Sequence, residues 1–286
     1  MRNSIAYIAV LILVVVAVIG YAALRSGAGT STGSSTTTAQ TSTVGGRTTV
    51  STSTTIPQTT TVTLTGSLQA YWKFDEGSGS TAYDSSGNGN TGTLVNSPAW
   101  VPGKLGDALS FNGRNQYVST NYYGVSGGHA RTFIAWVKVS GACYNPVCDI
   151  LTYGSEESGA RIEWSIEGNG VGLRAYESYI VYSAPNVSDG KWHQLAMVIP
   201  QNAALVNILV YEDGQLLDTV SESQFATSPI QTGSAKPVNI GRMYAGANIV
   251  GNPAPNGAAY FNGSIDDLRI YNIALNASQI SGLASS

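Results

Sequence analysis

Charged residues are scarce in this chain of 286 residues: Lys and Arg number 14 and Asp and Glu 17, or 11% together. A typical globular protein has about 25%. The sequence contains no run of basic residues, which excludes a nucleic-acid binder, because neutralising phosphates requires clustered Lys and Arg. A metal–thiolate protein is not indicated, because a four-ligand zinc site without carboxylates would need both Cys and both His.

Acidic residues are missing from the whole first part of the chain. None occurs before Asp75, and Arg2, Arg25 and Arg47 are the only basic residues before Lys73. From residue 67 onward the chain has 11 basic and 17 acidic residues, a net charge of −6. This distribution divides the chain into three segments: residues 1–25, 26–66 and 67–286.

The first segment predicts a membrane anchor. Residues 5–24 form an uncharged apolar run of 20 residues, which as a helix would span about 30 Å, the thickness of a bilayer hydrocarbon core. Tyr7 and Tyr21 lie near its two ends, where aromatic rings prefer the membrane interface. The alternative is a cleaved signal peptide, although the run is longer than the usual apolar region of about 7–15 residues. We predict an uncleaved transmembrane helix.

The second segment predicts a disordered stalk. Residues 26–66 contain 17 Thr and 7 Ser in 41 positions and no aromatic residue. Such a segment cannot bury enough apolar area to offset the entropy of ordering it. Its composition is typical of an O-glycosylated stalk, with a plain flexible linker as the alternative. A stalk belongs outside the cell, so we predict a single-pass protein of the cell membrane whose C-terminal domain is extracellular.

The two cysteines agree with an extracellular domain. Cys143 and Cys148 flank a short turn, and outside the cell they would most simply form a disulfide. The alternative is a redox-active pair, but such pairs are typically C-x-x-C at the start of a helix. This spacing is C-x4-C and includes Pro146. A structural disulfide is therefore the prediction.

The third segment, residues 67–286, predicts one all-β domain. Short runs of β-rich composition alternate with Gly, Asn, Asp and Pro. Residues 131–139 (RTFIAWVKV) are apolar on both faces, as in a central strand, and Asp213-Gly214 predicts a tight hairpin turn. The one short helical turn expected lies at residues 278–283. The pattern indicates an antiparallel β-sandwich or jelly roll.

Several motifs in this segment also carry a family resemblance. In chain order they are YWKFDEGSG (71–79), DSSGNGNTG (84–92), ALSFNG (108–113), AWVK (135–138), DGKWH (189–193), YEDG (211–214) and FNGSIDDLRIYN (261–272). Together they resemble the LamG-like jelly-roll domains of the concanavalin A-like lectin/glucanase superfamily. The resemblance covers nearly all of residues 67–286. It implies the fold, but the fold alone does not define a ligand.

The resemblance also implies a structural calcium ion, which would join an early loop to the terminal strand through Asp84 and Asp266. The loop at 84–92 places side-chain oxygens at every second residue, and Asn88 and Asn90 are the further candidate ligands. Asp266 shares a strand face with Leu268 in the expected alternation, so it should point inward, where a lone carboxylate needs a cation or several donors. The alternative is a polar turn, with Asp266 paired to an arginine such as Arg269 or Arg242.

Glucanases of the superfamily suggest a test for catalysis at residues 161–168 (RIEWSIEG). Their motif is Glu-x-Asp-x-Glu, in which the outer carboxylates act as nucleophile and acid/base. Here Glu163 and Glu167 occupy the outer positions, but Ser165 stands where the Asp is required. The sequence therefore predicts that the protein is not an enzyme. His193 in an apolar strand and His129 in a Gly-rich loop have no nucleophile motif beside them in sequence.

The aromatic residues favour a binding function. Of 26 aromatic residues, 24 lie in the β-domain, and Tyr rings suit both sugar stacking and protein interfaces. Tyr122, Tyr123 and Tyr144 lie in predicted loops and are the tyrosines expected to be exposed, but the sequence does not identify the ligand-binding residues. We predict a membrane-anchored cell-surface protein whose domain binds extracellular carbohydrate or a surface glycoprotein, as in adhesion. The alternatives are a structural or protein–protein interaction module of the cell envelope and, third, a glycoside hydrolase.

Overall fold

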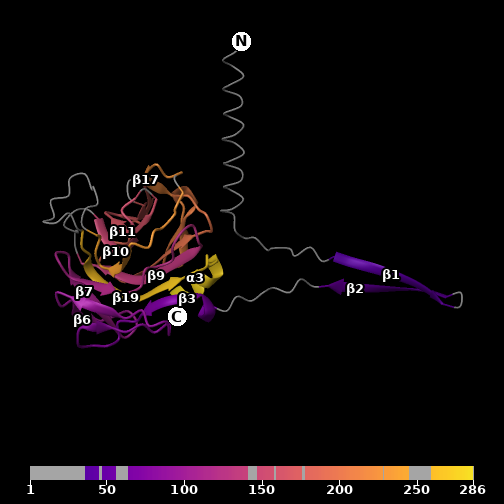
Figure 1. Cartoon of the computed structure of the whole chain (residues 1–286), viewed down its shortest axis with the longest axis horizontal. Coiled ribbons are helices and arrows are strands. Elements are labelled where there is room, and N and C mark those ends of the chain that lie inside the picture. The colour runs from indigo at the N-terminus through magenta and orange to yellow at the C-terminus, as the bar shows by residue number, and fades with distance from the viewer. Residues whose placement is uncertain are drawn as a thin grey trace, which may run out of the picture. The chain divides into compact units, whose positions relative to one another are not determined.

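The structure of the protein is a computed structural model, which divides the chain into two compact units, Met1–Val62 and Thr63–Ser286. We describe each unit by itself (Figure 1). The residues that the structure describes are 36–44, 47–55, 64–140, 147–157, 159–175, 178–227, 229–244 and 259–285.

In the first unit, the strands β1 (Thr36–Val44) and β2 (Arg47–Thr55) pair in antiparallel fashion, with Thr36 opposite Thr55. This differs from the disordered stalk predicted for residues 26–66. The prediction weighed only the lack of apolar residues, whereas β-branched Thr also favours an extended backbone. The predicted transmembrane helix at residues 5–24 lies outside the described residues. Within the described part of the chain, no helix is both long enough and apolar enough to span a membrane.

The second unit is an all-β antiparallel sandwich of two sheets, as predicted. Its elements are α2 (Leu64–Ser67), β3 (Leu68–Trp72), β4 (Thr81–Ala82), β5 (Gly92–Val95), β6 (Ala99–Pro102), β7 (Asp107–Asn112), β8 (Tyr117–Thr120), β9 (Arg131–Val139), β10 (Val147–Gly154), β11 (Arg161–Glu167), β12 (Gly170–Ala175), β13 (Ser178–Ser183), β14 (His193–Ile199), the 3-10 turn η1 (Leu205–Asn207), β15 (Leu209–Glu212), β16 (Gln215–Leu217), β17 (Val220–Gln224), β18 (Lys236–Ile240), β19 (Asn262–Tyr271) and α3 (Ala277–Ala284).

The first sheet has nine strands in the order β17-β13-β12-β11-β10-β18-β8-β5-β4. The second has the order β16-β15-β14-β9-β19-β7-β6, and β3 also pairs with β19. The main core lies between the inner faces of the sheets and includes Trp72, Phe133 and Trp164, each fully buried. The rings of Phe133 and Trp164 stack across the two sheets with their centroids 6.0 Å apart.

The outer face of the second sheet carries a smaller apolar cluster that α3 covers. Ile280 of α3 is fully buried there against strand residues such as Ile134, Val198 and Tyr271. Asn276 caps the helix by accepting a hydrogen bond from the Gln279 N–H. The yellow α3 in Figure 1 lies beside β3 accordingly.

Three predictions about local structure are confirmed. The strand β9 is central, between β14 and β19, and only Lys138 of its nine residues is exposed. Asp213 and Gly214 form the two-residue turn between β15 and β16, both with positive φ (51° and 77°), which matches the twist of a tight hairpin. The helical turn expected at residues 278–283 falls within α3.

Candidate functional site

One open pocket of the second unit combines an aromatic ring, an imidazole and two amides. Its volume is about 320 Å³, and it is lined by Gln69, Tyr122, Gly124, Val125, Ser126, His129 and Asn272. Gln69 comes from β3, the central five from the loop that follows β8, and Asn272 directly follows β19. The Asn272 N–H donates to the Ser67 carbonyl, 2.9 Å away, which holds the end of β19 against the start of β3.

A buried arginine holds the pocket loop from behind. Arg131, the first residue of β9, is fully buried. Its Nε donates to the His129 carbonyl at 2.9 Å, its Nη2 to the Gly127 carbonyl at 2.6 Å, and its Nη1 contacts the Val125 carbonyl. The same Nη1 lies 2.9 Å from the Tyr153 hydroxyl and 2.8 Å from that of Thr232. Three of these five contacts reach backbone carbonyls, so the guanidinium fixes the backbone of residues 125–129.

The loop also packs closely on the core. Gly124 has a φ of +70°, and a Cβ at this position would lie 2.2 Å from the Tyr153 ring. Any other residue there would clash, so the glycine permits the loop to lie directly on the ring. The Tyr122 side chain is half-buried and packs against the main core, whereas the neighbouring Tyr123 is 49% exposed. The prediction that both tyrosines are exposed therefore holds for Tyr123 only.

The loop at 84–92, where calcium was predicted, lies against Gln69 of β3, one of the residues that line this pocket. The Nδ2 atoms of Asn88 and Asn90 donate to the Gln69 carbonyl at 3.0 and 2.7 Å, and the Ser86 Oγ lies 3.2 Å from it. Asp84 lies at the centre of the loop. Its carboxylate accepts the N–H groups of Tyr71, Ser86 and Asn90 and the Ser86 hydroxyl, all at 2.8–2.9 Å.

These hydrogen bonds bear on the predicted calcium ligands. Burial opposes ionisation of Asp84, but the N–H donors outweigh it and lower its pKa, so the charge is balanced within the loop. Asp266 instead accepts the N–H groups of Lys104 and Leu105 at 2.8 and 2.9 Å, in a different loop. Both carboxylates are thus engaged by N–H donors, which does not fit direct coordination of calcium. Among the described residues, no group of three or more His, Cys, Asp or Glu is placed to hold a metal ion.

Asp266 is buried as predicted, but on the opposite face. A bulge between Asp266 and Arg269 adds a residue to β19, and Asp267 takes a φ of +55°. As a result Ile265, not Asp266, lies with Leu268 in the main core. Burial raises the pKa of Asp266 to about 7, and its Oδ1 has no hydrogen-bond partner within the described structure. Arg269 pairs with Asp267, so the predicted arginine alternative is also not observed.

The two glutamates that resemble a glucanase pair are each bound to an arginine. Glu163 is 1% exposed and lies 2.8 Å from Arg161 Nη1. Glu167 makes a two-pronged contact with Arg174, with its Oε1 2.8 Å from Nε. Asp149 faces Ser165 across the β10–β11 pairing, fully buried, and neither of its oxygens has a hydrogen-bond partner in the described structure. Burial, helped by the Glu163 charge, raises the pKa of Asp149 well above its ordinary value.

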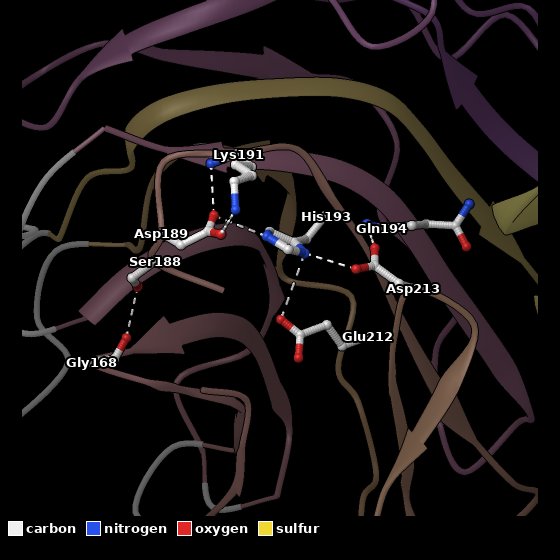
Figure 2. Close-up of polar contacts among 8 residues, drawn as sticks. All are labelled: Gly168, Ser188, Asp189, Lys191, His193, Gln194, Glu212 and Asp213. Atoms are coloured by element: carbon white, nitrogen blue, oxygen red, sulfur yellow. Dashed lines mark hydrogen bonds and ion pairs between the residues drawn. The ribbon is translucent and has the colours of Figure 1, made fainter. Parts of the chain in front are cut away.

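His193 lies in a network of carboxylates at the opposite end of the second sheet from the start of β9 (Figure 2). Its Nδ1 is 2.8 Å from Asp213 and its Nε2 is 3.1 Å from Asp189, while Glu212 is 3.9 Å away. Ionised carboxylates only accept hydrogen bonds, so an imidazolium, with two N–H groups, satisfies both close contacts. The network joins the turn at Asp213 to the loop at Asp189 and Lys191, which is a structural role.

The two cysteines are only partly within the description. Cys148 lies in β10 and is 3% exposed. Cys143 and Tyr144 lie outside the described residues, so the disulfide and the exposure of Tyr144 stay predictions.

Known proteins place the chain in a family. Residues 112–281 match the concanavalin A-like lectin/glucanases superfamily, and the chain belongs to it. A curated relative is the sushi, von Willebrand factor type A, EGF and pentraxin domain-containing protein 1 of Rattus norvegicus, 27% identical over 175 residues. That match covers 55% of this chain and only 4% of the relative, so the chain spans a small part of it.

Two solved structures share the jelly-roll fold. One is domain 4 of AbnA, a GH43 extracellular arabinanase from Geobacillus stearothermophilus, in complex with arabinotriose. It has a TM-score of 0.54 and 24% identity, over 76% of this chain and 98% of that one. The other is from botulinum neurotoxin type C, whose cell entry is dependent upon interaction with two ganglioside molecules; it has a TM-score of 0.53 and 16% identity. That match covers 78% of this chain and 51% of the neurotoxin chain.

Proposed function

We propose that the protein is a cell-surface, membrane-anchored binding protein whose concanavalin A-like domain binds extracellular carbohydrate, free or on a glycoprotein, without catalysis. The observation that carries the proposal is the pocket between β3, the loop after β8 and the end of β19. A ring, an imidazole and two amides are the groups that stack on sugars and bind their hydroxyls. A buried guanidinium fixes the loop beforehand, which lowers the entropy cost of binding.

The absence of catalysis is supported by the charges on the first sheet. A retaining glycosidase needs one ionised and one protonated carboxyl group, both facing the sugar. Glu163 is buried against Arg161, and Glu167 is held by Arg174. Neither group is placed to donate a proton to a substrate. A measurable release of sugar from a β-glucan, lost in Glu163→Gln, would contradict this part of the proposal.

Two proteins that share the fold are described with carbohydrates, arabinotriose and gangliosides. These ligands agree with the proposal, but at such low identity the likeness defines the fold alone. The membrane anchor rests on the apolar run at residues 5–24. Deleting residues 1–25 should release the protein from the membrane fraction of the expressing cells, and a protein that is released without the deletion would contradict the anchor.

The test of the main proposal is glycan-array binding by the full-length protein, run once with calcium and once with a chelator. Selective binding to a set of glycans supports the proposal. If binding disappears with the chelator, calcium is required, which would contradict the inference that N–H donors at Asp84 and Asp266 take the place of a metal. A folded protein that binds no glycan would contradict the proposal and point to the alternative, a protein–protein module of the cell envelope.

A further inference from the structure

We infer that the pocket is specific for neutral sugars, and that glycans whose terminal residue carries a carboxylate are excluded from it. This inference rests on the proposed function and narrows its ligand class. The shared fold leaves both classes open, since arabinotriose is neutral whereas gangliosides carry sialic acid.

The first step is the charge of the lining. Among the described residues that line the pocket, none is Asp, Glu, Lys or Arg. Gln69 and Asn272 each offer one carbonyl and one NH₂ group, the donor–acceptor pairing that neighbouring sugar hydroxyls match. Burial raises the pKa of the Tyr122 phenol, which therefore stays neutral. A carboxylate entering this lining would lose water and meet no permanent cation, because the His129 imidazole is the one basic group among the described lining residues.

The second step concerns the charges behind the lining. Arg131 and Asp84 act on the Tyr122 phenol with opposite signs, so their fields oppose each other there. Arg131 is also fully buried, and its N–H groups are directed at the carbonyls of Val125, Gly127 and His129. Its donors are therefore used within the protein, and a ligand in the pocket cannot bind them.

The third step is the charge of the rest of the domain. From residue 67 onward acidic residues outnumber basic ones, 17 to 11. Of those basic residues, five are in ion pairs within the described structure: Arg161, Arg174, Lys191, Lys236 and Arg269. The long-range electrostatic field of the domain thus does not attract an acidic glycan, and the described pocket lining has no Lys or Arg that could offset this.

The pocket volume of about 320 Å³ is at the lower end of the range for small-molecule sites. It suits the end of a glycan rather than a long internal stretch. A terminal acidic sugar would then have to place its carboxylate inside the pocket. We expect such a glycan to bind at least about tenfold more weakly than its neutral counterpart, because a carboxylate that gives up part of its water without gaining a cation loses more than one hydrogen bond contributes.

The experiment compares matched probes on the full-length protein at physiological salt. A glycan array presents each neutral glycan beside its sialylated or uronic-acid form, and lactose, 3′-sialyllactose and arabinotriose are then titrated in solution. The variants are Asn272→Ala, which removes a lining amide, and Asn272→Lys, which adds a cation. Asn169→Ala is the matched control, since Asn169 is exposed in the turn between β11 and β12.

The expected result is binding of neutral glycans, at least tenfold weaker binding of their acidic forms, and weaker neutral binding in Asn272→Ala but not in Asn169→Ala. Asn272→Lys should narrow the gap between the acidic and neutral forms. Equal binding of both forms, a preference for acidic ones, or neutral binding unaffected by Asn272→Ala would overturn the inference and leave carbohydrate binding standing. No binding of any glycan by the folded protein would instead overturn the proposed function.

Discussion

Replacing Arg131 by Lys should destabilise the domain, although the charge is kept. The guanidinium contacts five acceptors, three backbone carbonyls and two hydroxyls, in a fully buried setting. An ammonium group has three donors on one terminal atom and lacks the planar fork, and Lys has no donor at the position of Nε. The Val125 and Gly127 carbonyls keep another donor, but the His129 carbonyl, which Nε binds, has no other partner within the described structure. Leaving this acceptor unpaired costs about 1–3 kcal/mol, which lowers the Tm of a domain of this size by at least about 2 °C.

The assay is thermal unfolding followed by circular dichroism, with Arg114→Lys as the matched control. Arg114 is exposed, and the one hydrogen bond it makes in the described structure uses its backbone N–H. Glycan affinity is the second measurement, because the guanidinium holds residues 125–129 of the pocket. An Arg131→Lys protein with the Tm and the affinity of the control would refute the idea that this side chain positions the loop.

Three further predictions concern buried titratable groups and calcium. Asp149→Asn should stabilise the domain by about 1–3 kcal/mol at pH 8. The folded-state pKa of Asp149 is raised, so the wild type loses stability as the pH rises above the ordinary Asp range. The stability gained by the substitution should therefore shrink at pH 4. For His193, burial lowers the pKa, but hydrogen bonds to Asp213 and Asp189 outweigh it and raise it. The stabilisation is therefore complete below about pH 6.5 and lost as pH rises through the folded-state pKa, a slope in Tm that His193→Gln should abolish. Because N–H donors engage Asp84 and Asp266, the Tm of the wild type should be the same in calcium and in chelator. A higher Tm in calcium that Asp266→Asn abolishes would contradict this reasoning.

Most of the sandwich could be predicted because its signals are local. The run at residues 131–139 is apolar at both odd and even positions, as in a strand covered on both faces, and β9 is such a strand. Asp213-Gly214 defines a two-residue turn by its own backbone preferences. The pairing of Thr-rich β1 and β2 was missed, because a composition argument registers the lack of apolar residues and not the strand preference of Thr.

The pocket could not be predicted, because its residues belong to three distant segments with no shared motif. Gln69, His129 and Asn272 are ordinary polar residues in the sequence, and only the pairing of β3 with β19 brings the first and the last together. One signal was available. Arg131 is the first residue of an apolar strand, so it does not disturb the strand pattern. A charged side chain so close to a buried run needs hydrogen-bond acceptors, however, and the preceding loop is the nearest source of carbonyls.

Asp266 shows how one inserted residue changes a functional interpretation. Strict alternation along residues 263–271 places it beside Leu268, facing the core, where a lone carboxylate suggests a cation. The bulge at Asp267 exchanges the two faces of the sheet for the residues before it. Ile265 therefore lies in the core, and Asp266 lies beside its cross-strand neighbour Trp136 on the other face. There its Oδ2 receives two N–H groups from the turn at Lys104 and Leu105. Backbone donors thus supply much of what a metal would otherwise have to supply, and the same loop-fastening role explains Asp84. The carboxylates that the sequence suggests as ligands serve in the structure to hold the loops in place.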